Sequence, residues 1–474
     1  MTRVRENAVV ELLKLAPTAD ELAGRFAAAG HRLYLVGGSV RDALLGRAGS
    51  GGDLDFTTDA RPEQVQKILR GWADRQWDTG IAFGTIGAVR RGQTVEITTF
   101  RADRYDRESR NPEVAFGDTV ESDLLRRDFT VNAMAVQLPE RKFVDPHDGL
   151  AALAARVLDT PAAPEDSFAD DPLRMLRAAR FVSQLGFSVA PRVRAAMTAM
   201  APEITRITAE RVQAELNKLI TGAHPRAGIE LLVDTGLADH VLPEVPAMRL
   251  ATDEHMQHKD VYTHSLVVME QAISREEPGR PDLVLRMAAL LHDIGKPKTR
   301  KLEKDGRVSF HHHEVVGAKM TRARLRALRY SKATIDEVSR LVYLHLRFHG
   351  YGTGEWTDSA VRRYVTDAGP LLDRLHKLVR SDCTTRNRRR ASALQRSYDS
   401  LEERIAALRA QEELDAIRPD LDGNEIMRIL GIPPGPLVGK AYKHMLALRM
   451  ERGPISHEEA ETELRTWYAA QPPH

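Results

Sequence analysis

The sequence has little cysteine, few aromatic residues and no long apolar run. Cys383 is the single cysteine among 474 residues, which excludes an internal disulfide framework and suits a reducing compartment. No segment approaches the roughly 18 apolar residues of a membrane span, and the N-terminal MTRVRENAVVELL is too charged for a signal peptide. We therefore expect a soluble, cytoplasmic protein with no membrane partner.

A strong excess of either charge is also missing. The chain has 69 basic and 67 acidic residues and a formal net charge of +2, so any affinity for RNA must come from local patches. Its length exceeds what one core usually organises and suggests about three domains. The motifs below divide it into four: 1–150, 151–250, 251–385 and 386–474. The oligomeric state stays open.

Residues 31–58 are the stretch around which the first part of the chain is organised. An apolar strand ends at Gly37-Gly38, where missing Cβ atoms allow a tight turn and close approach to a ligand. Ser39 is expected to cap the short helix that follows. A helix that begins after a glycine turn is suited to binding phosphate.

Two aspartates follow on the next predicted strand. Asp53 and Asp55 are two residues apart and project to one face, while Leu54 and Phe56 face the core. Neighbouring carboxylates repel each other unless a cation lies between them, and oxygen ligands suit Mg²⁺. The alternative is a solvated acidic turn. Glu96, on the second strand of a hairpin predicted at 84–100, could join the two aspartates or be an ordinary exposed glutamate.

Two basic motifs come next. In residues 126–134, RRDFTVNAM, adjacent Arg126 and Arg127 can reach a triphosphate, and Asp128 and Asn132 are expected on one helix face. Another helix is expected to start at Asp170-Asp171-Pro172. Its polar residues recur every three positions: Asp171, Arg174, Arg177 and Arg180. The alternative is a capped helix with an Asp171–Arg174 ion pair.

Histidine is concentrated in one segment. Nine of the seventeen histidines lie between His255 and His349, far above an even spread. This enrichment predicts a site that uses imidazole. Histidines satisfied within helix packing are the alternative.

Taken together, GGSVRD, DLDF and RRDFTVNAM resemble the class II CCA-adding tRNA nucleotidyltransferases and their poly(A) polymerase relatives. The resemblance implies an α/β polymerase β-like nucleotidyltransferase head followed by mostly α-helical neck, HD and tail domains. It further implies that Asp53 and Asp55 bind Mg²⁺, with Glu96 as the third catalytic carboxylate. By the same resemblance, the nucleotide-binding residues of the head are Gly37, Gly38, Ser39, Arg41, Arg127, Asp128 and Asn132.

Residues 170–181, DDPLRMLRAARF, resemble the family's base-reading motif. Asp171 and Arg174 match the residues that read the Watson–Crick edges of CTP and ATP, and Arg177 and Arg180 match contacts to phosphate and sugar. Asp170 replaces the usual glutamate, and Ala152 stands where the family usually has aspartate in a third motif.

The histidine segment resembles the HD phosphohydrolase superfamily. The residues that match its divalent-metal ligands are His264, His292, Asp293 and Asp382, with His313 and His345 as extra candidates. Imidazole and carboxylate ligands suit Mg²⁺, Mn²⁺, Ni²⁺ or iron, and composition does not choose among them.

The resulting functional hypothesis is addition of C and A nucleotides from CTP and ATP to the 3′ end of tRNA. A poly(A) polymerase or an A-adding enzyme shares the head motifs, and an HD phosphohydrolase acting on nucleotides or RNA ends is the alternative of another class. The polar loop at 101–119 matches one that helps reshape the family's site for the final A, and its length argues against enzymes that add only CC. The basic cluster at 386–390 suits RNA backbone or is a solvated charge run.

Overall fold

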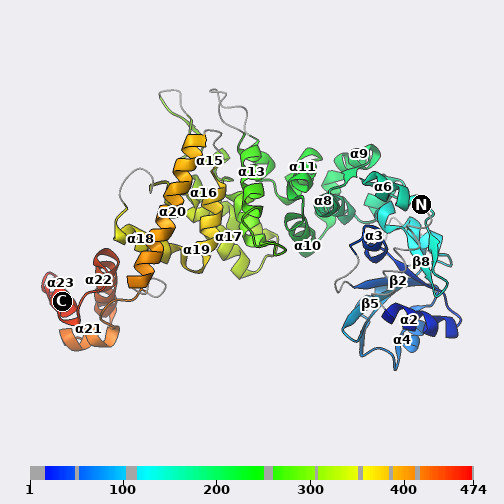
Figure 1. The fold of residues 1–474 in the computed structure, drawn as a ribbon, viewed down its shortest axis with the longest axis horizontal. Coiled ribbons are helices and arrows are strands. Elements are labelled where there is room, and N and C mark those ends of the chain that lie inside the picture. The colour runs from blue at the N-terminus through cyan, green and yellow to red at the C-terminus, as the bar shows by residue number, and fades with distance from the viewer. Residues whose placement is uncertain are drawn as a thin grey trace. The chain divides into compact units, whose positions relative to one another are not determined.

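The structure, a computed structural model, describes residues 17–47, 53–102, 115–249, 260–304, 308–350, 356–383, 388–411 and 417–471. The chain forms two compact units, Met1–Val241 and Leu242–His474 (Figure 1). Most of the 101–119 loop lies outside the described residues, as do the first two residues of the 386–390 cluster, whereas its last three begin a helix. Among the helices that are described, none has the length and apolar character needed to cross a bilayer.

A seven-stranded mixed sheet is the framework of the first unit. Its strands, in spatial order, are β3 (Arg75–Trp77), β4 (Thr85–Arg90), β5 (Gln93–Thr99), β2 (Leu54–Thr58), β1 (Leu33–Val36), β8 (Ala135–Leu138) and β9 (Lys142–Val144). All neighbours pair antiparallel except β2 and β5, which are parallel. The hairpin predicted at 84–100 is confirmed as β4 and β5.

Side-chain alternation decides which face of this sheet each helix covers. Helices α2 (Pro17–Ala28) and α4 (Pro62–Leu69) pack on one face, where Leu54, Phe56 and Ile97 are buried (Figure 1). On the opposite face, α5 (Val120–Leu125) covers β1 through a cluster of buried residues: Tyr34, Val36, Phe100, Val120, Leu124, Ala133 and Ala135. Since Tyr34 pairs with Thr57, this is also the face onto which Asp55 projects.

The rest of the first unit is mostly helical, as predicted. Its elements are α6 (Gly149–Ala155), β10 (Val157–Leu158), α7 (Pro164–Asp170), α8 (Leu173–Leu185), β11 (Ser188–Val189), α9 (Pro191–Met200), η3 (Ala201–Arg206), α10 (Ala209–Ile220), α11 (Pro225–Asp234) and α12 (Leu237–Val241). Helix α8 packs against α10 and α11, so the residues after Pro172 are held between the head and these two helices.

The second unit is helical, with the apolar α14 at its centre. Helix α14 (Leu283–Leu291) contacts α13 (Val261–Ile273), α17 (Lys332–Leu344) and α19 (Leu372–Ser381). The other elements are η4 (Pro246–Met248), α15 (Lys296–Thr299), β12 (Lys301–Leu302), β13 (Val308–Ser309), α16 (His313–Ala327), η5 (His345–Gly350), α18 (Asp358–Ala368), η6 (Gly369–Leu371) and α20 (Arg388–Gln411). Helices α21 (Gly423–Leu430), α22 (Pro436–Arg452) and α23 (His457–Ala469) share a separate small core at the end of the unit.

Candidate functional site

The glycine turn brings β1, a basic motif and the acidic strand together. Gly37 has a φ of +73° and precedes α3 (Gly38–Leu44). A Cβ placed on Gly37 would lie 3.2 Å from Arg127 Nη1 and 3.5 Å from Asp55 Oδ2. Any side chain here would be strained by the backbone and would also crowd both groups, so the position requires glycine.

The expectation that Ser39 caps α3 is wrong. Gly37 occupies the cap position, because its positive φ turns the chain directly into the helix. Ser39 lies in the first turn, where its hydroxyl donates to the Asp53 carbonyl over 3.3 Å. Ser39 therefore ties α3 to the start of the acidic strand.

The three predicted carboxylates lie on neighbouring strands. Asp55 pairs in register with Glu96 of β5, and Asp53 immediately precedes β2. Burial raises the pKa of Asp55 to about 6; Arg127 opposes this rise, while Glu96 and Asp53 add to it. A half-buried carboxyl beside two further acids is a place where a bound cation would be strongly favoured.

The RRDFTVNAM motif is not a continuous helix, contrary to the prediction for Asp128 and Asn132. Helix α5 ends at Leu125, and Asn132 lies in a 3₁₀ turn, η2 (Thr130–Asn132). The two side chains still meet, because Asn132 Nδ2 donates to Asp128 Oδ1 over 3.0 Å. Asn132 Oδ1 also accepts from Arg41 Nη1 at 2.7 Å, which links this turn to α3.

Asp128 is held by several donors at once. Its Oδ2 accepts from Arg177 Nε at 2.8 Å and Nη2 at 2.6 Å, and its Oδ1 accepts from the Phe129 amide at 2.8 Å. Burial alone would raise the pKa of Asp128, but Arg177 and Asn132 together hold it far below its usual range. Asp128 is thus an ionised anchor that fixes the Arg177 guanidinium.

The segment predicted to read the base begins at a break between two helices, not within one. Asp170 ends α7, and α8 starts at Leu173 after Pro172. Asp171 Oδ1 accepts from the Leu173 amide at 3.1 Å, and its Oδ2 pairs with Arg211 Nη2 at 2.8 Å. Asp171 therefore accepts from the first amide of α8 and is also one member of an ion pair, and that pair is not with Arg174.

The arginines of α8 have separate partners. Arg174 donates to the Ser167 hydroxyl at 2.9 Å and to the Arg126 carbonyl at 2.7 Å, which fixes α8 to the head. Arg180 Nε lies 2.9 Å from Glu215 Oε2 on α10, and both side chains are buried. Burial lowers the pKa of Arg180 to about 10, although Glu215 opposes the shift.

All six predicted histidine and aspartate residues of the second unit converge. His264 Nε2 lies 2.9 Å from Asp382 Oδ1, and His292 Nε2 lies 3.2 Å from Asp293 Oδ2. On the other side of Asp293, Oδ1 lies 3.2 Å from His313 Nε2 and 3.9 Å from His345 Nε2. Asp293 thus belongs to two possible metal-binding groups, one with His264 and His292 and the other with His313 and His345. Within each group the potential ligand atoms lie within 4.8 Å of one another.

The imidazoles of this cluster are oriented by backbone carbonyls. The Nδ1 atoms of His292, His313 and His345 lie 2.8, 2.8 and 2.6 Å from the carbonyl oxygens of Ala289, Phe310 and Val342. In the neutral form with Nδ1 donating and Nε2 deprotonated, each ring would direct a lone pair toward the Asp293 carboxylate and a neighbouring Nε2. Acceptors that face one another fit a divalent cation between them, and a carbonyl on the second nitrogen is the usual support of a metal-binding histidine.

Three family models match the chain: the poly A polymerase head domain at residues 33–159, a probable RNA and SrmB-binding site of polymerase A at 186–248, and the HD domain at 261–408. The A-adding tRNA nucleotidyltransferase of Deinococcus radiodurans is 32% identical over 445 residues, which cover 92% of this chain and 96% of that protein. This chain belongs to the tRNA nucleotidyltransferase family. Enzymes of this family depend on metal ions.

Two further relatives among the tRNA nucleotidyltransferases are CCA-adding enzymes. That of Lacticaseibacillus paracasei is 39% identical over 240 residues, which cover 50% of this chain and 58% of that enzyme. The crystal structure of the Bacillus stearothermophilus CCA-adding enzyme in complex with CTP has a TM-score of 0.67 and 27% identity, and covers 97% of this chain and 98% of its own. The predicted fold class is therefore confirmed.

Sequence reasoning missed two polar partners in this tRNA nucleotidyltransferase, Arg211 and Glu215. Glu215 had a detectable signal, because it lies among Val212, Leu216 and Leu219 on the apolar face of α10, where an unpaired charge is costly. Arg211 is exposed and gave no such signal.

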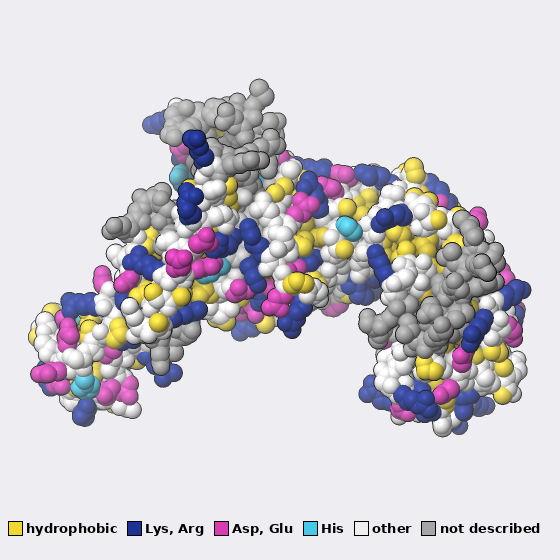
Figure 2. Space-filling view, viewed as in Figure 1, with side chains coloured by type: hydrophobic (Ala, Val, Ile, Leu, Met, Phe, Trp, Pro, Cys, Tyr) yellow, Lys and Arg dark blue, Asp and Glu magenta, His cyan; other side chains and the backbone are white. Residues whose placement is uncertain are grey.

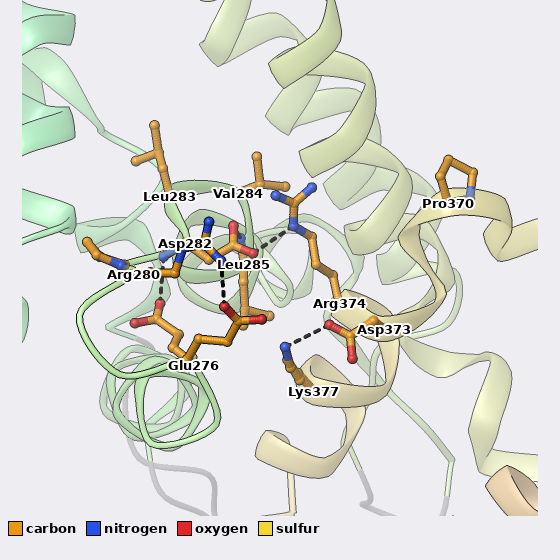
Figure 3. Close-up of a pocket in the computed structure, with 12 residues that line it drawn as sticks. Glu276, Arg280, Asp282, Leu283, Val284, Leu285, Pro370, Asp373, Arg374 and Lys377 are labelled. Carbon is orange, nitrogen blue, oxygen red and sulfur yellow. Dashed lines mark hydrogen bonds and ion pairs between the residues drawn. The ribbon is translucent and has the colours of Figure 1, made fainter.

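A cavity of about 520 Å³ in the second unit lies between the segment before α14 and helix α19 (Figure 3). Its charged side chains all have partners: Arg374 pairs with Asp282 at 2.7 Å, Lys377 with Asp373 at 2.7 Å, Arg280 with Glu277 at 2.9 Å, and Glu276 with Arg286 at 2.7 Å. Because these charges already have partners, the cavity has no strong field with which to attract an ion.

Proposed function

We propose that this chain adds C and A nucleotides, taken from CTP and ATP, to the 3′ end of tRNA. The observation that carries the proposal is the convergence of Gly37, Arg127 and Asp55, with Glu96 paired beside Asp55. Asp55 favours a bound cation, Arg127 supplies positive charge, and the Gly37 turn leaves room beside the backbone. Together these groups are suited to binding a nucleoside triphosphate. The A-adding and CCA-adding relatives support tRNA as the acceptor.

In this proposal the RNA 3′-oxygen forms a bond to the α-phosphorus of the nucleotide. The bond from that phosphorus to the oxygen shared with the β-phosphate breaks, pyrophosphate leaves, and the hydroxyl proton passes to solvent. Mg²⁺ held by Asp53 and Asp55 would supply positive charge to the attacking and leaving oxygens. Arg127, which lies beside Asp55 and pairs with Asp123 over 3.3 Å, binds the triphosphate.

The sequence of nucleotides added is tested with unmodified tRNA ending before CCA, after C or after CC. Each is incubated with CTP, ATP or both, and the 3′ ends are sequenced. Complete CCA ends on the shortest substrate would support the proposal. Long A tracts would instead identify a poly(A) polymerase.

Addition of A alone is the second candidate, because a relative that aligns over nearly the whole chain is an A-adding enzyme. In the same assay such an enzyme would extend only tRNA that already ends in CC, and only with ATP. Extension of the shorter substrates by CTP would exclude it.

For the choice of base, we infer that the Asp171 carboxylate accepts from the amino group shared by cytosine and adenine. Asp171→Ala is then expected to lower the kcat/KM preference for CTP over UTP by about fivefold to a hundredfold, since one buried polar pairing is worth about 1 to 3 kcal/mol. Arg211→Ala is the matched control, because it removes the partner of Asp171 and keeps the carboxylate. An unchanged CTP preference in Asp171→Ala would leave this residue with only its structural contacts to Leu173 and Arg211.

We further propose that the second unit is a divalent-metal phosphohydrolase centred on Asp293. His292 and Asp293 replaced together by Ala should remove metal binding and any metal-dependent hydrolysis of nucleotides or RNA ends, because Asp293 takes part in both groupings. Nucleotide addition should persist, since its residues lie in the other unit. The neighbouring His311 and His312, with side chains 77% and 83% exposed, give a control pair that should retain the metal. The metal bound by each purified variant is measured by elemental analysis.

The division of the chain into four domains stays a prediction, as do the individual site roles. The identity of the metal in the second unit is open among Mg²⁺, Mn²⁺, Ni²⁺ and iron. Elemental analysis of the wild-type protein answers that question directly.

A further inference from the structure

A row of paired positions crosses four strands of the head sheet. Trp77 pairs with Gly87, Gly87 with Glu96, and Glu96 with Asp55. Residues that pair directly project to the same face of a sheet. The Trp77 indole therefore shares a face with the carboxylates, and Gly87 lies two strand spacings from Asp55, about 10 Å.

Gly87 lets the indole lie against the sheet. A Cβ on Gly87 would come within 2.2 Å of Trp77 Cε2, so a side chain at this position would displace the ring. Trp77 is half-buried at the edge strand β3. One side of the ring packs on the β4 backbone, which holds the indole in place and leaves the rest of it accessible.

Arg75 lies beside this ring. It is two residues before Trp77 on β3 and therefore projects to the same face. Its Cζ is 5.6 Å from the indole centroid, and the side chain is exposed. An aromatic ring for stacking beside a cation for phosphate is the combination by which proteins bind single-stranded nucleic acid.

The position of this pair relative to Asp55 matters for the reaction. Gly37 and Arg127 adjoin Asp55 from the side of β1, whereas Gly87 and Trp77 lie on the side of β5 and β4. In phosphoryl transfer the attacking and leaving oxygens are roughly in line on opposite sides of the phosphorus. With the triphosphate at Arg127, the RNA hydroxyl approaches over β5 and β4.

We propose that Trp77 and Arg75 form a platform for the RNA acceptor, on which a base close to the 3′ end stacks while Arg75 contacts the adjoining phosphate. The proposal rests on the proposed function of the head and adds two positioning residues to it. Neither residue touches the reacting atoms. Their effect is to fix the strand whose end reaches Asp55.

The test compares Trp77→Ala with Trp77→Phe in steady-state addition. Trp77→Ala should raise KM for tRNA about fivefold to a hundredfold, the range expected for one stacked base, and leave KM for CTP and ATP within about twofold. Trp77→Phe should recover most of the loss, because a phenyl ring still stacks. Gln76→Ala is the control, since Gln76 is exposed and projects to the other face. An unchanged KM for tRNA in folded Trp77→Ala would overturn the platform.

Tryptophan fluorescence gives a readout that does not depend on turnover. Titrating a tRNA acceptor-stem RNA into the wild-type protein should quench the emission of Trp77. The Trp77→Phe variant lacks this indole, so its fluorescence should be quenched less. Equal quenching in both proteins would overturn the proposal, because the indole would then only pack on Gly87. If the wild-type protein added no nucleotide, the proposed function would fail, and this titration would still decide whether Trp77 binds RNA.

Discussion

Replacing Asp55 by Asn is expected to lower nucleotide addition at least about a thousandfold, because the change removes charge from a proposed Mg²⁺ ligand that interacts with Arg127 and Glu96. Asp53→Asn should cause a loss of the same order. Asp78→Asn, at an exposed acid elsewhere in the head, should leave the rate near the wild-type value. The rates are measured in single turnover on tRNA lacking its 3′ end. Near wild-type addition by Asp55→Asn would contradict the metal assignment.

Although Asp55→Asn should lower activity, it should make the metal-free protein more stable than the wild type at neutral pH. Because the pKa of Asp55 is raised to about 6 in the folded protein, above the value of about 4 in an unfolded chain, ionisation of this group opposes folding. In the absence of metal the wild-type protein should therefore lose stability relative to Asp55→Asn as pH rises from about 4 to 6, and the difference should persist above 6. Melting temperatures in chelator across this pH range measure it. A wild-type protein more stable than the variant at pH 7 would contradict the argument.

The second large effect concerns the link between the head and α8. Asp128→Ala should lower the free energy of unfolding by about 3 to 5 kcal/mol, since it leaves Arg177 without its partner in a mostly buried site. The Arg465–Glu461 pair on α23, in which the Arg465 side chain is 57% exposed, provides the control, because Arg465→Ala should cost only about 0.3 to 0.5 kcal/mol. Denaturant unfolding of both variants gives the comparison. A similar small cost for Asp128→Ala would show that its four hydrogen bonds stabilise little.

Acid should reproduce part of this loss in the wild-type protein. The pKa of Asp128 is lower in the folded state than in the unfolded chain, so its contribution is complete above about pH 4 and is lost as pH falls below that value. A double variant, Asp128→Leu with Arg177→Met, should recover much of the stability, because no charge is then left buried. Nucleotide addition should stay low in this double variant, which separates folding from nucleotide binding.

Local patterns predicted much of this site. The strand around Asp55 and the β4–β5 hairpin follow from two-residue alternation, which depends only on neighbouring side chains. The same alternation allowed Glu96 to share a face with Asp55, and the structure pairs the two in register. For the six metal-ligand candidates of the second unit, resemblance supplied the set, and the structure brings them together.

Other features depended on contacts between distant parts of the chain. Arg177 was assigned to phosphate and sugar from its motif, and nothing near it in the sequence indicated that Asp128 would hold its guanidinium. The Ser39 cap failed because a serine before an apolar run is typical of helix starts, whereas the conformation of Gly37 decided the start here. Trp77 lies in no recognisable motif, and its position on the same sheet face as the carboxylates could not be predicted, because it depends on the order of the strands.

The parallel pairing of β2 with β5 has a consequence for how the protein is made. Asp55 leaves the ribosome well before Glu96, and the intervening helix α4 and strands β3 and β4 must be synthesised before the two carboxylates can become neighbours. Pairing on the other edge of β1 is delayed further, because its second partner, β8, begins only at Ala135. Pairings between such distant residues form slowly, so a nascent head carries an incomplete sheet until Val144, the end of β9, has emerged. Slowed translation shortly after this point should favour correct folding, whereas a stop before it should yield an insoluble fragment.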